Sequence, residues 1–155
     1  MDINLNDKSK VKNLADWPIS WEKLTSAGDE YIKANATIPI RNDEIETQVN
    51  NGNKLYTGTD GLGSHARIYI DNPDMREYLG FDNKEEGRVQ FILDDEKCQQ
   101  ILDYKTFATF KKHLKEDVVT NQEKAKIINY ARKVKLNDFE KIKELESHCE
   151  MKFSV

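Results

Sequence analysis

The apolar pattern of this sequence changes near residue 94. After this point, successive segments place apolar residues three or four positions apart, the spacing of one face of an α-helix. Before it, the stretches "NKLYTG", "HARIYI" and "RVQFIL" alternate apolar and polar residues, as half-buried strands do. The sequence therefore predicts an α+β fold, with a small antiparallel β-sheet and short helices in the N-terminal half and a helical bundle in the C-terminal half.

The same change suggests how the chain is divided. We expect residues 1–93 to form a mixed α/β subdomain with a glycine-turn hairpin, and residues 94–155 to form a helical subdomain. The two parts would together make one compact domain, because 155 residues fall within the usual size of a single domain. A chain of this length also buries enough surface to fold without disulfides.

The helical half carries clear local signals. Asp94 or Asp95 can cap the first helix, and Thr120 stands three residues before Glu123, the spacing of a capping box. Asn137 and Glu140 have the same spacing. The residues that we expect to face the helical core are Phe107, Phe110, Leu114, Val118, Ile127, Ile128, Ala131, Val134, Phe139, Ile142, Leu145 and Cys149.

The N-terminal half gives weaker signals. The segment "ISWEKLTSAGDEYIKAN" has apolar residues near helical spacing and is interpreted as a helix that begins at Ser20. "TIPIRND" is interpreted as an extended edge segment because of Pro39, and "NDEIETQVNNGN" as a short helix. In "DNPDMREYLGF", Asn72 can cap a helix whose first residue is Pro73.

The stretch "GTDGLGSH", residues 58–65, is the segment most similar to a ligand-binding loop, because it holds three glycines. A phosphate-binding P-loop ends in Lys-Ser or Lys-Thr at the start of a helix, whereas Ser64 and His65 lead into an alternating segment. The dinucleotide-binding fingerprint also needs a helix here. We therefore predict that the glycines only reverse the chain, as the turn of a β-hairpin formed by "NKLYTG" and "HARIYI".

Four side chains of this expected hairpin form a candidate binding face. His65, Arg67 and Tyr69 would project from one side of their strand, with Tyr56 across the hairpin. Three interpretations are open. The face is solvated and has no specific role, it contacts a protein or stacks on bases, or His65 acts as a general base beside Arg67.

The net charge of −4 conceals two blocks of opposite charge. Residues 71–103 hold ten acidic and four basic residues, net −6, and residues 104–135 hold nine basic and three acidic residues, net +6. The blocks either pair with one another or offer charged faces to partners. A nucleic-acid contact would come from residues 104–135, through the basic side chains Lys111, Lys112, Lys115, Lys124, Lys126, Arg132, Lys133 and Lys135.

The last two helical segments could form a helix-turn-helix, but the final one is acidic and lacks the Arg, Asn and Gln residues that read base edges. An antiparallel helical hairpin that closes the bundle is the favoured interpretation. We expect no metal site and no cofactor, because the three histidines lie in different segments and Cys98 and Cys149 are far apart. Without an apolar signal region or an apolar run near ~18 residues, we expect a cytoplasmic protein that makes no membrane contact.

The leading hypothesis is a non-enzymatic regulatory protein that binds another protein, for example an inhibitor of bacterial or phage origin that docks on a larger, nucleic-acid-processing protein. The hairpin face and the charged surfaces would make the contact. The alternative is a nucleic-acid-binding protein that uses the basic helices. A third hypothesis is a small hydrolase or nuclease that uses His65 and Arg67.

Overall fold

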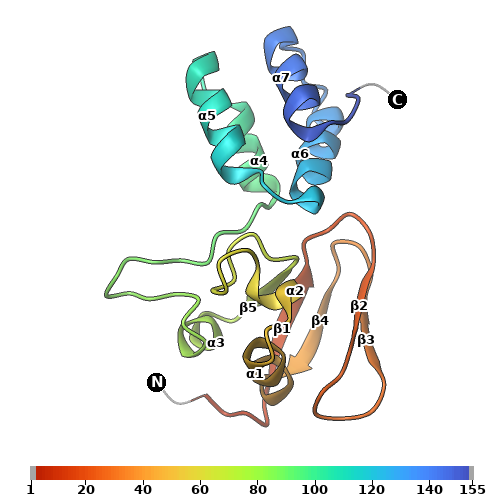
Figure 1. Cartoon of the computed structure of the whole chain (residues 1–155), viewed down its shortest axis with the longest axis vertical. Helices are drawn as coiled ribbons and strands as arrows, with labels where there is room; N and C mark the ends of the chain where they lie inside the picture. Colours follow the sequence, from red (N-terminus) through yellow and green to blue (C-terminus); the bar gives the residue numbers. More distant parts are fainter. Residues whose placement is uncertain (1–2, 154–155) are drawn as a thin grey trace. The chain divides into compact units, whose positions relative to one another are not determined.

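The computed structural model describes residues 3–153, and the chain divides into two compact units, Met1–Ile92 and Leu93–Val155 (Figure 1). We call them the first unit and the helical unit. The strands lie in the first unit, and helices make up the second, so the chain has the α+β fold that the sequence predicts.

The first unit contains a three-stranded antiparallel sheet, a separate β-hairpin and three short helices. The sheet has the order β4-β1-β5, and the hairpin is formed by β2 and β3. The elements are β1 (Lys8–Asn13), β2 (Ile19–Glu22), β3 (Asp29–Ile32), β4 (Thr37–Arg41), α1 (Asn42–Asn50), α2 (Lys54–Thr57), β5 (Ile68–Asp71) and α3 (Pro73–Tyr78).

One face of the three-stranded sheet is buried. In the centre, Val11 of β1 lies opposite Ile38 of β4 on one side and Ile70 of β5 on the other. Because residues that lie directly opposite in an antiparallel pair point to the same face, these side chains form one apolar row. Ile45 of α1 and Tyr56 of α2 belong to the same buried cluster, so both helices cover this face.

The extended segment "TIPIRND" is confirmed as β4, and its predicted place at an edge is also confirmed, since β4 pairs only with β1 in the sheet order. The short helix that follows is confirmed as α1. Asn72 caps α3 as predicted, because its side-chain oxygen accepts hydrogen bonds from the amides of Asp74 and Met75, and Pro73 is the first helical residue.

The predicted helix in "ISWEKLTSAGDEYIKAN" is wrong, because this segment forms the β2–β3 hairpin. Ile19 and Trp21 alternate with exposed residues, and the chain reverses at Gly28, where φ is +98°. The Glu44 carboxylate holds the reversal in place, since it accepts hydrogen bonds from the amides of Leu24 and Thr25 at 3.0–3.2 Å. Because these two amides bond to a carboxylate that is distant in the sequence, they favour the open turn over a helix.

The predicted hairpin around the glycines is also wrong. Residues 54–57 form α2, which Asn53 caps, and β5 pairs with β1 instead of with the segment before the glycines. The predicted strand "RVQFIL" is wrong as well, since residues 89–93 form neither strand nor helix. Arg88 makes an isolated bridge with Asn83, and its guanidinium pairs with Asp60 of the glycine loop. This segment is therefore bonded to the glycine loop and not to the edge of a sheet.

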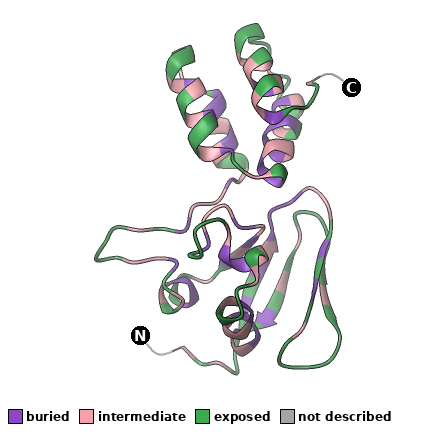
Figure 2. Cartoon of the chain, viewed as in Figure 1, coloured by how far each residue is buried: buried purple, intermediate pink, exposed green. Residues whose placement is uncertain are grey.

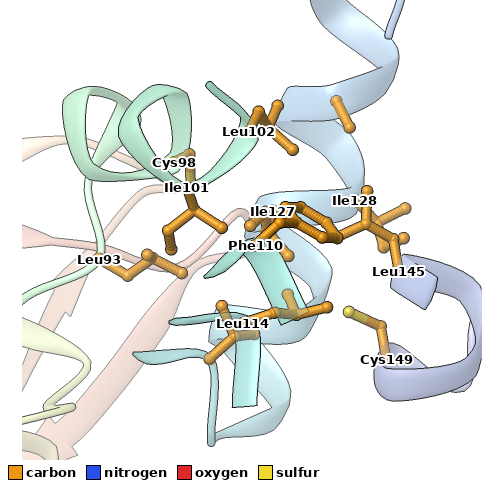
Figure 3. Close-up of a cluster of buried hydrophobic side chains, with 12 residues drawn as sticks. Leu93, Cys98, Ile101, Leu102, Phe110, Leu114, Ile127, Ile128, Leu145 and Cys149 are labelled. Carbon is orange, nitrogen blue, oxygen red and sulfur yellow. The ribbon is translucent and has the colours of Figure 1, made fainter. Parts of the chain in front are cut away.

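The helical unit consists of α4 (Asp95–Leu102), α5 (Phe107–Asp117), α6 (Asn121–Lys133) and α7 (Phe139–Cys149). Helices α4 and α7 each pack against both α5 and α6. Figure 3 shows side chains from all four helices converging on one apolar core, with Phe110 and Ile127 near its centre. Figure 2 shows the same division along the helices, with buried residues on the inner faces and exposed residues outside.

Most of the predicted helix starts are confirmed. Asp94 caps α4, and Thr120 and Glu123 form the capping box of α6. Helix α7 differs by one residue, because Asp138 and not Asn137 accepts the capping hydrogen bond, here from the amide of Lys141.

Three residues that we expected in the helical core are exposed, namely Phe107 (37%), Val134 (41%) and Phe139 (70%). Phe107 and Val134 follow the apolar faces of α5 and α6 but stand at the ends of these helices, past the last buried layer. Phe139 has a different cause. Six residues of helix rotate a side chain by about 600°, so Phe139 points about 120° away from the buried Leu145. Within residues 3–153, no helix has the length and apolar character that crossing a bilayer requires.

Candidate functional site

The glycine loop, residues 58–65, is held by hydrogen bonds within the chain. The Asp60 carboxylate accepts hydrogen bonds from the amides of Leu62 (2.8 Å) and Ser64 (3.2 Å), which are the donors that a phosphate would use. It also receives the guanidinium of Arg88 at 2.7 Å. Burial would raise the pKa of Asp60, but the bonds from Arg88 and the two amides together lower it. The loop is a closed turn whose carboxylate stays ionised.

Glycine is needed at two positions in this loop for steric reasons. A Cβ atom on Gly58 would lie 2.0 Å from the backbone oxygen of Ser64. A Cβ atom on Gly63 would lie 2.7 Å from the Phe81 ring and 2.9 Å from the Gln90 side chain. Both residues also have positive φ, +68° and +88°. The prediction that the glycines bend the chain is confirmed, although the segments on either side do not pair as a hairpin.

Tyr56 does not belong to a surface. It is fully buried in α2, where its ring meets Trp21 edge-on with the ring centroids 5.4 Å apart. Burial is the main cause that raises its pKa above the ordinary value, and the nearby Glu44 and Glu30 raise it further. Among the described residues, neither the Tyr56 hydroxyl nor the Trp21 indole nitrogen has a hydrogen-bond partner. The structure therefore removes Tyr56 from the predicted binding face.

The other three members of that face do not form a row on one strand. His65 lies in the loop before β5 with φ of +59°, and its ring packs against Phe91 at 4.6 Å between centroids. Tyr69 lies on β5, on the side away from the core, where the guanidinium of Arg76 stands 5.0 Å from its ring. Arg67, which lies between them in the sequence, is half-buried. A binding or catalytic role for these residues stays a prediction.

The eight predicted basic residues have different surroundings. Lys126 is buried, and its ammonium lies 3.9 Å from the Asp95 carboxylate. Arg132 uses its guanidinium to bind the backbone oxygens of Lys152 and Phe153. Both side chains therefore have partners within the chain, and a phosphate contact by them stays a prediction. The remaining members are half-buried or exposed and stay candidates for a charged contact, and they are Lys111, Lys112, Lys115, Lys124, Lys133 and Lys135.

A surface that the sequence did not predict lies at one end of the helical unit. Lys141 of α7 donates hydrogen bonds from its ammonium to the backbone oxygens of Leu102 (2.6 Å) and Tyr104 (2.9 Å). These bonds hold the start of α7 against the α4–α5 connection. Figure 1 shows that the starts of α5 and α7 and the end of α6 lie at this same end of the helices.

Exposed apolar and basic side chains share this end. Phe139 is the most exposed of the apolar ones, and the ammonium of Lys143 stands 5.0 Å from its ring. We call this set the Phe139 surface, and its members are Phe107, Val134, Phe139, Lys105, Lys133, Lys135 and Lys143. A helical wheel aligned on Leu145 and Cys149 would have placed Phe139 outside the core, which is the signal that sequence reasoning missed.

Comparison of the chain with protein-family models, with curated proteins and with solved structures finds no match in any of the three. Among residues 3–153, no three His, Cys, Asp or Glu side chains gather in a way that could hold a metal ion.

Proposed function

We propose that this chain is a non-enzymatic binding protein that docks through the Phe139 surface on an acidic surface of a larger protein and thereby regulates it. The observation that supports the proposal is the combination of a 70% exposed phenylalanine with two further exposed apolar side chains at the same end of the helices. Single exposed apolar residues are normal on a protein surface, whereas several that gather at one end of a domain favour a binding site.

The composition of the surface resembles that of known interface types. Protein interfaces commonly have an aromatic anchor at the centre and a polar rim that stays partly hydrated. Phe139 supplies the anchor, and its complete burial would contribute about 1.5–3 kcal/mol. The lysines of the rim would steer an acidic partner toward it, and the N-terminal ends of α5 and α7 add partial positive charge.

An acidic protein fits this surface better than a nucleic acid does. Aromatic side chains can stack on bases, but a nucleic acid needs a continuous basic path along its phosphates, and Asp138 and Glu140 on either side of Phe139 in the sequence interrupt such a path. A protein partner needs only local acidic groups opposite the lysines. The internal partners of Lys126 and Arg132 also make a continuous phosphate-binding path less favourable. A regulatory role, including inhibition of the partner, is part of the same proposal.

The test is a comparison of three immobilised forms of the chain in a lysate of the organism that encodes it. We expect the wild type to retain a partner protein that Phe139→Ser fails to retain, with at least about a tenfold loss of affinity for an anchor residue. Tyr31→Ser is the matched control, because Tyr31 is an exposed aromatic residue of β3 in the other unit. Equal capture by wild type and Phe139→Ser would refute the proposal.

A salt titration separates the two classes of partner. Binding of DNA or RNA with an affinity that falls steeply with salt, and that Phe139→Ser leaves unchanged, would favour the nucleic-acid hypothesis. We expect no such binding by the wild type at moderate salt.

A further inference from the structure

A second candidate surface lies on the first unit, between α3 and the turn that follows it. Here the chain forms a groove with a volume of about 230 Å³. We call it the α3 groove, and the lining residues that matter for the argument are Pro73, Asp74, Glu77, Asp82, Lys84 and Val89. Its lining holds three carboxylates and two basic side chains, Lys84 and Arg88, and Arg88 pairs with Asp60 outside the groove, so the groove is net acidic. The Phe139 surface is basic, so the two would recognise different partner chemistry.

The groove is held open by bonds that do not depend on a ligand. The Asp82 carboxylate accepts a hydrogen bond from Arg76 Nε at 2.8 Å and another from the amide of Gln90 at 2.9 Å. Arg76 in turn donates to the backbone oxygen of Ile70 at 2.8 Å, which ties the turn to β5. The shape of the groove is therefore set before any partner arrives, which lowers the entropy cost of binding.

The walls of the groove are apolar and its rim is acidic. Val89 is 70% exposed, and Pro73 stands exposed at the start of α3. Asp74 and Glu77 lie on the outer side of α3, and within residues 3–153 Asp74 forms no ion pair. Long basic side chains suit such a site, because their alkyl stems cover apolar surface while the charged head meets a carboxylate.

The chain's own Lys84 shows that the rim accepts an ammonium group. Its nitrogen lies 3.7 Å from the Glu77 carboxylate, while its side chain is 82% exposed. An ion pair this exposed contributes little to stability, so a competing cation can replace it at small cost.

We propose that the α3 groove binds a lysine or arginine side chain of a partner protein, with the alkyl stem against Val89 and Pro73 and the cationic head at Glu77 and Asp74. Lys84 moves aside when the partner's side chain enters. This contact is independent of the Phe139 surface, so either one can fail without the other.

The experiment is an NMR titration of the ¹⁵N-labelled full-length chain with N-acetyl-lysine-N-methylamide and its arginine counterpart. We expect amide shifts confined to residues 73–89. The norleucine derivative, which has an alkyl side chain without the ammonium, should bind at least about threefold more weakly, the range that an exposed charge pair gives. Equal binding of the norleucine derivative, or an absence of shifts in residues 73–89, would overturn the proposal.

Three variants test the assigned positions in the same titration. Glu77→Gln should weaken binding of the lysine derivative by about threefold. Lys84→Ala should strengthen binding of the lysine derivative by about twofold, because the ammonium that competes for Glu77 is removed. Glu85→Gln is the control, since Glu85 is an exposed carboxylate of the same turn outside the groove lining, and it should leave the affinity unchanged. Weaker binding by Lys84→Ala, or an equal loss in the Glu85→Gln control, would contradict the assigned positions.

Discussion

The two units hold their elements together by different means. In the first unit, buried polar side chains connect segments that are far apart in the chain, as when Ser9 of β1 receives a hydrogen bond from Asn72 at 2.9 Å and donates one to Asn42. In the helical unit, apolar faces meet in one core, and each helix begins with its own cap. The first unit therefore adds specific bonds between distant segments to its own apolar cluster, and the helical unit depends on shape and on local signals.

This difference matters for function. The polar bonds of the first unit rigidify loops and turns, including the glycine loop and the wall of the α3 groove. In the helical unit, the apolar faces of α5 and α6 extend past the core and leave Phe107 and Val134 exposed, and Phe139 of α7 points away from the core at the same end. Substitutions in each unit test whether these two modes of stabilisation are real.

The largest effect is expected from Phe110→Ala in the helical unit. Phe110 is fully buried at the centre of the core, so its truncation should lower the free energy of unfolding by about 3–5 kcal/mol. Chemical denaturation followed by circular dichroism measures the loss. The matched control is Phe107→Ala one turn earlier, where partial exposure should limit the cost to about 1 kcal/mol. Similar losses in both variants would contradict the assigned core.

A smaller effect is expected from Gly58→Ala in the first unit. The added Cβ would meet the Ser64 backbone at 2.0 Å and would also need the unfavourable positive φ, so we expect a loss of about 3 kcal/mol. Gly61→Ala is the control, because Gly61 has a similar φ of +77° but open space around the Cβ position. It should cost about 1 kcal/mol, measured by the same denaturation experiment. A loss of stability in Gly61→Ala as large as that in Gly58→Ala would show that backbone strain, and not crowding at the Cβ position, causes the loss in this loop.

The smallest of the three is expected from Glu44→Gln. Burial would raise the pKa of the Glu44 carboxyl, but hydrogen bonds from Thr25, Gln48 and Leu24 together lower it. Because the pKa is lower in the folded state, the ionised carboxylate stabilises the fold above the unfolded-state pKa of about 4.3, and this contribution is lost as the pH falls through the folded-state value.

The variant removes that contribution. At neutral pH we expect a loss of about 2 kcal/mol, the usual range for hydrogen bonds to a charged group. The stabilities of wild type and variant should approach one another as the pH is lowered from about 5 toward 3, as thermal denaturation at several pH values would measure. A difference that stays constant with pH would mean that the carboxylate is not the source of the stabilisation.

The sequence predicted the helical unit better than the first unit, and particular residues explain why. Thr120 and Glu123 determine the start of α6 by contacts within one turn, so their spacing alone was enough. Strand β1 was not predicted, because its inward residues are Ser9, Val11 and Asn13, of which only one is apolar. Asn13 can be buried because Trp17, Ile32 and Lys33 provide backbone oxygens for its amide. Ile32 and Lys33 are 19 and 20 residues away, so no local pattern predicts these two partners.

The candidate sites were predicted less well than the fold. Tyr56 was placed on a surface because its segment alternates, but the Asn53 cap turns that segment into α2 and buries the ring. Phe139 was placed in the core because it is apolar and near the right spacing, whereas its rotation around α7 puts it outside. In both cases the residue type was noticed, and the direction of the side chain followed from local helix geometry that the apolar pattern alone did not give.

Photo-crosslinking at residue 139 tests directly whether the Phe139 surface contacts a partner protein. A chain in which Phe139 is replaced by p-benzoylphenylalanine should form a covalent adduct with one partner protein when irradiated in its own cells, and the same replacement at Tyr31 should not. An adduct with the same protein from Tyr31, or none from position 139, would contradict the proposed docking surface.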